Sequence, residues 1–228
     1  MREKIFFVSG TDTDVGKTVA TGMMCRALAA AGRDWISVKA VQTGCEGFPE
    51  DLAAHRRIAG CGMFPEDAEG LTAPQVFKFP SSPLLAADLE GTAVDVDRIA
   101  RCVDECARRR EIVLVEGAGG LCVPLSADLL FADFAAARGW PLVLVASGKL
   151  GAINHALLSI EAARSRGMEI AAVLVNSFPE TDPRLFADAL SAVRRGLARA
   201  GADCPAIVLP LLGSGAAPDF SGIKGLLK

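Results

Sequence analysis

The sequence is poor in the residues and segments that mark metal sites, redox centres and membrane spans. It has only two histidines, His55 and His155. Two are too few for a histidine-rich metal site, and we expect either to be a surface or helix-capping residue. The seven cysteines form no C-x-x-C pair, so reduced and mostly buried thiols are expected in place of a zinc site.

Long apolar runs and an excess of positive charge are also missing. No apolar run approaches the roughly 20 residues that cross a bilayer. The net charge is −3, which gives no electrostatic reason to expect nucleic acid or an anionic membrane as a partner. The first residues, MREKIFFVSG, do not resemble a signal peptide and run directly into a loop motif. These features predict a cytosolic protein.

Short apolar runs alternate with amphipathic stretches along the 228 residues. Runs rich in Val, Ile and Leu predict strands covered on both faces, at 4–9, 35–41, 111–117, 141–147, 169–177 and 206–210. Helical patterns lie at 17–31, 95–109, 152–166 and 184–200. The alternation predicts an α/β fold with a mostly parallel sheet and helices on both faces, in one domain over 1–228. The segment 44–94 is predicted to be an irregular excursion that forms a lid or binds substrate.

The stretch VSGTDTDVGKTVAT at 8–21 contains a phosphate-binding loop with unusual spacing. The pattern G-x-x-x-x-G-K-[ST] places its first glycine where this chain has Thr11, and the glycine stands one residue earlier, at Gly10. The loop still follows a buried strand and opens a helix, which disfavours a chance match at a helix N-terminus. Backbone N–H groups of 14–18 can surround phosphates, with Lys17 on the β- and γ-phosphates and the Thr18 hydroxyl on Mg²⁺.

Three charged residues outside the loop extend this site. Glu116 closes a buried strand at the edge where open α/β sheets bind ligands, so it is a candidate metal ligand, against the alternative of a solvated strand end. Asp51 is either a second ligand or an ordinary carboxylate at a helix N-terminus. Lys39 either stabilises a transferring phosphoryl group or simply extends to solvent. The glycines that allow backbone to approach the phosphates are Gly117, Gly119 and Gly120.

Four motifs, taken together, resemble the dethiobiotin synthetase family. They are GTDTDVGKT, VKAVQTG, VLVEGAGG and KLGAINHALL, in the family's order and at similar spacing, and the resemblance extends to about residue 178. It implies a single P-loop NTPase-like α/β domain that forms homodimers, with the substrate near the interface. It also implies that ATP and Mg²⁺ are used to join diaminopelargonate and CO₂ into dethiobiotin, the penultimate intermediate of biotin synthesis.

The same resemblance assigns roles to individual positions. Lys39 and Lys17 correspond to catalytic residues, and Mg²⁺ is held by Thr18, Asp51 and Glu116. Asn176 corresponds to the residue that reads the adenine edge. The nucleotide-binding set is Asp14, Val15, Gly16, Lys17, Thr18, Val19, Asp51, Glu116, Gly117, Ala118, Gly119, Asn176, Ser177, Pro210, Leu211 and Leu212. The substrate-binding set is Thr11, Asp12, Thr13, Thr43, Gly151 and Asn154.

The resemblance also bears on the shifted glycine, which becomes a family trait. With the glycine at position 10, residues 11–13 are free to project toward a second substrate, and we expect Asp12 to approach the amines of the diamine. Asp14 is expected to point to solvent. The chain departs from the family at Ala40, where proline is frequent, and at Leu84, where histidine is common. It has no tyrosine, so any family tyrosine on the substrate carboxylate is replaced.

Two other functions share parts of these motifs. Cobyrinate synthases of the amidotransferase type have a similar loop, but they need a glutaminase domain for which this chain has no room. Partitioning-type ATPases, which act as switches on protein partners, carry an additional lysine near the start of the loop, where this sequence has Gly10, Thr11 and Asp12. Turnover that requires a diamine and bicarbonate distinguishes the enzyme from such a switch.

Overall fold

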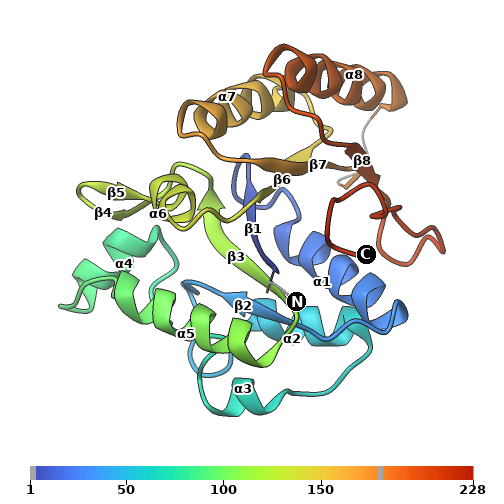
Figure 1. The fold of residues 1–228 in the computed structure, drawn as a ribbon. Helices are drawn as coiled ribbons and strands as arrows, with labels where there is room; N and C mark the ends of the chain where they lie inside the picture. The colour runs from blue at the N-terminus through green and yellow to red at the C-terminus, as the bar shows by residue number, and fades with distance from the viewer. Residues whose placement is uncertain (1–3, 179–181, 228) are drawn as a thin grey trace.

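A six-stranded parallel sheet forms the centre of the computed structural model, which describes residues 4–178 and 182–227 (Figure 1). The strand order is β2-β3-β1-β6-β7-β8. Their bounds are β1 Lys4–Gly10, β2 Trp35–Lys39, β3 Ile112–Gly120, β6 Leu142–Ser147, β7 Ile170–Asn176 and β8 Ala206–Leu209. A small antiparallel pair, β4 (Pro124–Ser126) and β5 (Leu129–Leu130), follows β3.

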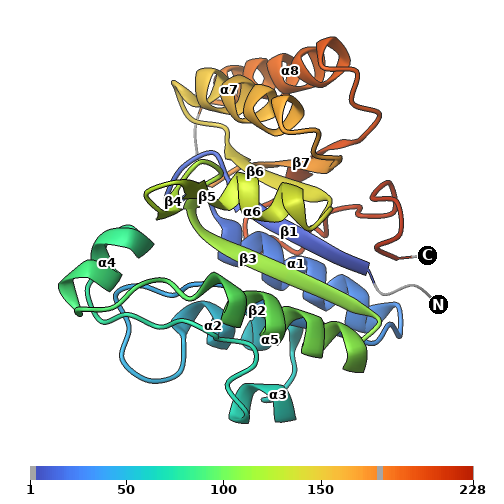
Figure 2. The same cartoon turned by 60° about the vertical axis from the view of Figure 1, so that its left-hand side comes forward.

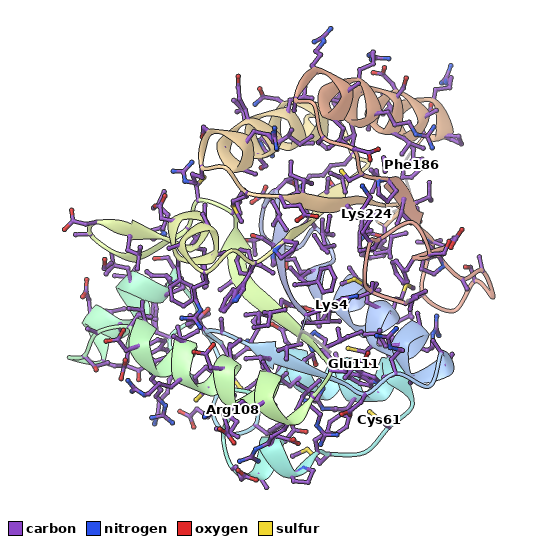
Figure 3. The ribbon with its side chains drawn as sticks, viewed as in Figure 1. Lys4, Cys61, Arg108, Glu111, Phe186 and Lys224 are labelled. Atoms are coloured by element: carbon purple, nitrogen blue, oxygen red, sulfur yellow. The ribbon has the colours of Figure 1, made fainter. Side chains whose placement is uncertain are left out.

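Helices cover both faces of this sheet (Figure 2). Helix α1 (Lys17–Ala30) packs on one face. On the other face lie α5 (Val96–Arg109), α6 (Phe131–Ala137), α7 (Ala152–Ser165) and α8 (Pro183–Arg199). Three further helices, α2 (Glu50–Ala59), α3 (Pro65–Ala68) and α4 (Pro83–Leu89), belong to the segment between β2 and α5. Between these helices and the sheet, side chains fill the space (Figure 3).

The alternation of side chains along each strand divides the core into two layers. Phe6 and Val8 of β1 pack with α1, whereas Phe7 between them packs with α6 and its neighbours. The same alternation holds for β3 and β6, and for β7 from Ala172 onward. Because both faces are buried, each strand needs apolar residues at every position, which explains the continuous Val, Ile and Leu runs.

The predicted fold class is confirmed. Each predicted strand and helix exists, with ends that differ by at most three residues from those expected. The cysteines are free, and four of them are buried, Cys25, Cys45, Cys102 and Cys106. Across the described ranges, no helix has both the length and the apolar character needed to cross a bilayer.

The prediction of an irregular segment at 44–94 holds for most of its length and was wrong for three stretches, where α2, α3 and α4 lie. Helix α2, with the sequence EDLAAHRRIA, packs against α1 and buries His55 and Arg56 along with Leu52 and Ile58. Its buried face is therefore partly polar, and a search for apolar periodicity does not detect it. The expectation of a surface or capping role for His55 was likewise wrong, since its side chain is fully buried.

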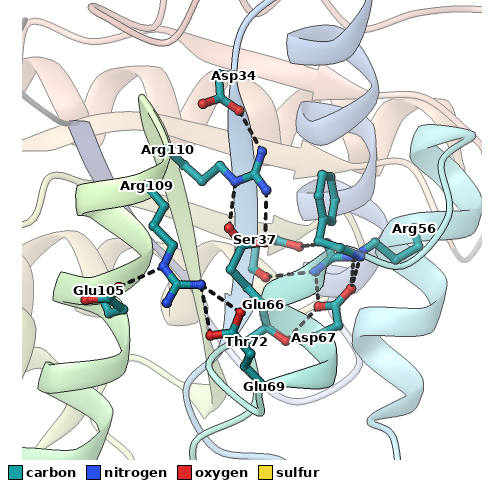
Figure 4. Close-up of polar contacts among 11 residues, drawn as sticks. Asp34, Ser37, Arg56, Glu66, Asp67, Glu69, Thr72, Glu105, Arg109 and Arg110 are labelled. Atoms are coloured by element: carbon teal, nitrogen blue, oxygen red, sulfur yellow. Dashed lines mark hydrogen bonds and ion pairs between the residues drawn. The ribbon is translucent and has the colours of Figure 1, made fainter.

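A network of polar side chains joins this segment to the sheet (Figure 4). Arg56 donates two hydrogen bonds to Asp67, at 3.0 and 2.6 Å, and a third to the Ser37 hydroxyl of β2 at 2.7 Å. Burial would raise the pKa of Asp67, but hydrogen bonds from Arg56, the Phe64 N–H and the Thr72 hydroxyl hold it below its usual value. The network thus keeps a buried charge pair fully hydrogen-bonded, as burial of charge requires.

The hydroxyl of Thr72 gives a direct test of this network. Thr72 is fully buried and donates to Asp67 Oδ1 at 2.7 Å. We expect Thr72→Val to lower the free energy of unfolding by about 1.5–3 kcal/mol, the usual worth of a hydrogen bond to a charged group. Urea denaturation measures it, with the exposed Thr92→Val as the matched control. Equal stability of the two variants would contradict the role of the network.

The difference in the free energy of unfolding between wild type and Thr72→Val should depend on pH. Because the pKa of folded Asp67 lies below the ordinary pKa of an aspartate, the stabilisation is present above that ordinary pKa and is lost as pH falls through the folded pKa. The stability gap between wild type and Thr72→Val should therefore shrink only in strong acid.

Candidate active site

A cavity of about 880 Å³ lies at the carboxyl ends of the strands. Strand β1 sits between β3 and β6: β2 and β3 lie on one side of it and the later strands β6, β7 and β8 on the other. Open α/β sheets bind ligands at such a switch point in strand order. The lining residues follow β1, β2, β3, β7 and β8. They are Thr13, Asp14, Gly16, Lys17, Thr18, Val19, Lys39, Val41, Gln42, Thr43, Asp51, Glu116, Ala118, Gly119, Asn176, Phe178, Pro210, Leu211 and Leu212.

The loop between β1 and α1 explains the displaced glycine. A Cβ atom on Gly10 would lie 2.7 Å from the Asp12 carbonyl oxygen and 2.8 Å from Val15 Cγ2, so only glycine fits there. Gly16 has φ 96° and precedes α1 directly, and Asp14 has φ 56°. Glycine is thus required at positions 10 and 16 because the loop folds back on itself, whereas position 11 needs no glycine.

Lys17 lies inside this loop. Its side chain is buried, and Nζ donates to the Asp12 carbonyl at 3.0 Å. Burial, with the nearby charge of Lys39, lowers the pKa of Lys17. The free N–H groups at the start of α1 point into the same region, so loop and helix together present donors and a positive dipole to an anion.

Four residues from four elements meet beside the loop. Thr18 Oγ1 lies 2.8 Å from Asp51 Oδ1 and 3.3 Å from Glu116 Oε1. Lys39 Nζ lies 2.6 Å from Asp51 Oδ2 and 2.8 Å from Glu116 Oε1, and it also donates to the Gly117 carbonyl at 3.0 Å. The structure therefore brings together the residues predicted to hold the metal, with Lys39 between the two carboxylates.

The charges in this cluster are strongly coupled. Burial would raise the pKa of Glu116, but Lys39 and the hydrogen bonds that the carboxylate accepts keep its pKa well below the usual range. Burial would lower the pKa of Lys39, and the carboxylates of Glu116 and Asp51 raise it. Both groups are therefore charged at neutral pH, as a site for a cation and a polyphosphate requires.

The carboxamide of Asn176 connects β7 to the loop. Its Nδ2 donates to the Val15 carbonyl at 3.0 Å, and its Oδ1 accepts from the Phe178 N–H at 3.1 Å. A Cβ atom on Gly16 would lie 2.2 Å from Nδ2, which is a second reason for glycine at that position. Both polar atoms of Asn176 are thus engaged within the protein, and its assignment to the adenine edge stays a prediction.

Comparison with known proteins now decides the family. A family model described as an AAA domain matches residues 4–214. The chain is 42% identical over 219 residues to the ATP-dependent dethiobiotin synthetase BioD of Chlorobaculum tepidum, covering 96% of this chain and 92% of that protein. It is 43% identical over 194 residues to BioD 2 of Pasteurella multocida, covering 85% and 91%. The chain belongs to the dethiobiotin synthetase family.

Among solved structures, the likeness is one of fold. The signal recognition particle 54 kDa protein of Aeropyrum pernix, in complex with GDP, has a TM-score of 0.57 at 17% identity. The receptor FtsY of Elizabethkingia anophelis, also with GDP, has a TM-score of 0.52 at 17% identity. The chain is covered to 96% and 91% in these two comparisons but spans only 44% and 57% of the two structures.

The substrate residues predicted from the dethiobiotin synthetase motifs fall into two groups. Thr13 and Thr43 line the cavity, whereas Thr11, Asp12, Gly151 and Asn154 are not among its lining residues. Gly151 precedes α7, and the next turn approaches the loop, since His155 Nδ1 lies 3.9 Å from Asp12 Oδ2. The Asp12 side chain is half exposed, and its Oδ1 accepts from the Thr13 N–H.

The nucleotide-binding set is almost complete in the cavity wall. Val15, Gly117 and Ser177 are the predicted members that do not line it. Val15 is buried, the Gly117 carbonyl accepts from Lys39, and the Ser177 hydroxyl donates to the Leu209 carbonyl. The structure adds Val41, Gln42 and Phe178 to the wall, and none of these was predicted from the sequence.

Proposed function

We propose that this chain is a dethiobiotin synthetase that uses ATP and Mg²⁺ to close 7,8-diaminononanoate and CO₂ into the cyclic urea of dethiobiotin. The observation that carries the proposal is the convergence of Lys17, Lys39 and an oxygen-donor cluster in the wall of one cavity, in a member of this family. Such a cavity has room for a nucleotide and a second small substrate, because ligand pockets of this kind measure about 300–1,000 Å³.

The donor set fits Mg²⁺. Thr18, Asp51 and Glu116 offer a hydroxyl and two carboxylates, the oxygen ligands that this hard cation prefers. Within the described residues, His, Cys, Asp and Glu form no cluster of three or more that could hold a metal by itself. That is consistent with Mg²⁺, which usually takes one or two carboxylates together with substrate phosphates. Bound there, it would polarise phosphate oxygens as a Lewis acid.

The proposed reaction has three steps. One amine of the substrate adds to CO₂ and loses a proton, which gives a carbamate. A carbamate oxygen then attacks the γ-phosphorus and expels ADP, leaving a carbamic-phosphoric anhydride. The second amine attacks the anhydride carbon, loses a proton and expels phosphate as the ring closes. Lys17 and Lys39 neutralise charge on the phosphoryl group during its transfer, and the loop holds the reacting atoms in position.

The Lys39 contacts support this role. Lys39 compensates the charges of Asp51 and Glu116. A cation held by the same carboxylates would take over that compensation and would leave the ammonium group free to contact phosphates. Lys39 is buried, whereas a strand-end lysine that extends to solvent would be exposed.

Thr18 tests the metal assignment. Thr18→Val preserves the shape of the side chain and removes its oxygen ligand, so we expect the Mg²⁺ concentration for half-maximal activity to rise at least tenfold, in line with the effects of losing support at metal sites. A Mg²⁺ titration of the initial rate at saturating ATP measures this. An unchanged Mg²⁺ requirement would exclude Thr18 as a ligand.

Asp12 tests the position of the diamine. Because its carboxylate carries a negative charge at the edge of the site, Asp12→Asn should weaken apparent diamine affinity by about tenfold, the scale of a charge-assisted hydrogen bond. The KM for the diamine reports it, with the KM for ATP as the internal control. The exposed Asp128→Asn serves as the matched variant. A diamine KM equal to wild type would remove Asp12 from the substrate site.

The assembly and location are part of the same proposal. We propose one domain over 1–228 that forms a homodimer with the substrate near the interface. The exposed Leu150, just before α7, and Leu158, in the middle of α7, support an interface there, because these residues are 81% and 55% exposed. A cytoplasmic location fits the free cysteines. Sedimentation analysis, with and without Leu150→Asp, tests the dimer.

The function itself is tested by the dependence of ADP release on both co-substrates. We expect release to require diaminopelargonate and bicarbonate together. Release that needs neither, and that responds to an added protein, would favour the partitioning-type switch.

A further inference from the structure

His55 is completely buried and contacts Glu116 on the side of the carboxylate that faces away from Thr18 and Lys39. The imidazole Nε2 lies 2.9 Å from Glu116 Oε2, and Nδ1 lies 3.1 Å from the Ser37 hydroxyl. Both side chains are fully buried. His55 lies one helical turn after Asp51 on α2, so the same helix carries a predicted metal ligand and this contact.

The two oxygens of Glu116 have different partners. Oε1 faces the cavity side, where it contacts Lys39 and Thr18. Oε2 faces the interior, where it contacts His55 and, at 2.6 Å, the Thr21 hydroxyl. Thr21 also lies 3.0 Å from the Lys17 carbonyl, and its single hydroxyl proton can serve only one of these two acceptors. The His55 N–H therefore provides a donor to Oε2 that no other acceptor shares.

The polar network of Figure 4 sets the orientation of that donor. Ser37 Oγ accepts from Arg56 Nη1 at 2.7 Å, and Arg56 is held by Asp67. Ser37 Oγ still has its one hydroxyl proton to donate, and that proton can point to His55 Nδ1. Its other neighbour is the thiol of Cys25, a weak acceptor that burial keeps neutral by raising its pKa to about 12. Nδ1 then accepts this hydrogen bond, and the Nε2–H group donates to Glu116 Oε2.

We propose that His55 is a positioning residue, which fixes the Glu116 carboxylate so that Oε1 is presented to the Mg²⁺–nucleotide. The proposal rests on the function proposed above. Hydrogen bonds to a metal-ligating carboxylate control its orientation and basicity, and this general behaviour supports the positioning role of His55. A purely structural role, filling the space between α2 and β3, is the competing explanation.

The coupling between Mg²⁺ and ATP distinguishes these explanations without a turnover assay. We would measure the Kd of ATP by calorimetry with Mg²⁺ and with EDTA, and take the ratio of the two Kd values as the coupling. In folded His55→Leu, the coupling should fall about 10–100-fold, while the Kd in EDTA stays within about threefold of wild type. His55→Gln restores an N–H near the place of Nε2 and should recover most of the coupling.

Controls separate loss of stability from loss of positioning. Leu197→Ala, on the buried face of α8, destabilises the protein far from the site and should leave the coupling unchanged. If His55→Leu does not fold, Ser37→Ala is decisive, because it keeps His55 and removes the proton donor to Nδ1. It should lower the coupling several-fold.

Unchanged coupling in His55→Leu, or in Ser37→Ala if the former does not fold, would overturn the positioning role and leave the proposed function intact. A wild-type protein that binds ATP equally with and without Mg²⁺ would overturn the proposed metal site, and this inference with it.

Discussion

Replacement of Lys17 by Met is expected to lower kcat/KM for ATP by about 10³–10⁵. Two losses combine in this figure: the charge-assisted contact with the ground-state phosphates, of about 1.5–3 kcal/mol, and one electrostatic donor in the transition state, of about 10²–10³ in kcat. The buried Nζ of Lys17 lies within the loop and donates to the Asp12 carbonyl, so the group is already in position before ATP binds. Steady-state kinetics, with calorimetry for ATP, separates the two losses.

The exposed Lys224 provides the matched control, since Lys224→Met removes the same charge at a pair with Asp203 on the surface. It should change kcat/KM by less than about twofold, because most surface substitutions have small effects. Lys17→Met with near-normal ATP affinity and rate would show that the cavity does not bind the triphosphate through this loop.

Lys39→Gln should act mainly on the chemical step. We expect kcat to fall by about 10²–10³, the effect of losing one preorganised donor, while the Kd of ATP changes by less than about fivefold. The physical reason is that the loop and Lys17 still hold the phosphates, whereas the moving phosphoryl group loses a cation. Single-turnover and steady-state rates on folded Lys39→Gln measure this.

The result for Lys39 is sensitive to its contacts with Asp51 and Glu116. Lys39→Gln leaves these carboxylates less compensated, so a urea denaturation curve must accompany the kinetics, and saturating Mg²⁺ should restore part of the stability. Lys224→Gln is the matched control. A kcat within about twofold of wild type in the folded variant would make Lys39 a structural counter-ion only.

The sequence predicts most of the fold because the two-faced sheet requires apolar strands, and those runs are easy to see. It also places Thr18, Asp51, Lys39 and Glu116 at the same edge, since parallel strands end together. The structure brings these four side chains into contact. What the sequence does not show is the register of side chains at that edge, for instance which oxygen of Glu116 faces Lys39.

The burial of His55 and Arg56 could not be predicted either, and the physical reason is a different one. Helix α2 buries His55 and Arg56, and their burial is possible only because Glu116, Ser37 and Asp67 satisfy them from other elements. Such compensation is tertiary, so no local pattern reveals it. One signal was available, because His55 follows Asp51 by four residues and therefore shares its helix face.

The glycine at position 10 shows a similar limit. Its need follows from the approach of the Asp12 carbonyl and the Val15 side chain, which is a property of the folded loop. A search for the usual phosphate-loop pattern would reject the chain at Thr11. The position that requires glycine is the one where other atoms of the loop come too close for a Cβ atom, and that position differs between loops of different geometry.

The central claim is that ring closure consumes a diamine, CO₂ and ATP at this site, and product analysis tests it most directly. The purified protein is incubated with diaminopelargonate, isotopically labelled bicarbonate, ATP and Mg²⁺, and the products are analysed by mass spectrometry beside an ADP assay. The products should be dethiobiotin that carries the label in its ureido carbon and one ADP for each product molecule. Neither product should form without Mg²⁺, and both should form far more slowly with Lys17→Met. Release of ADP without labelled dethiobiotin would contradict the account.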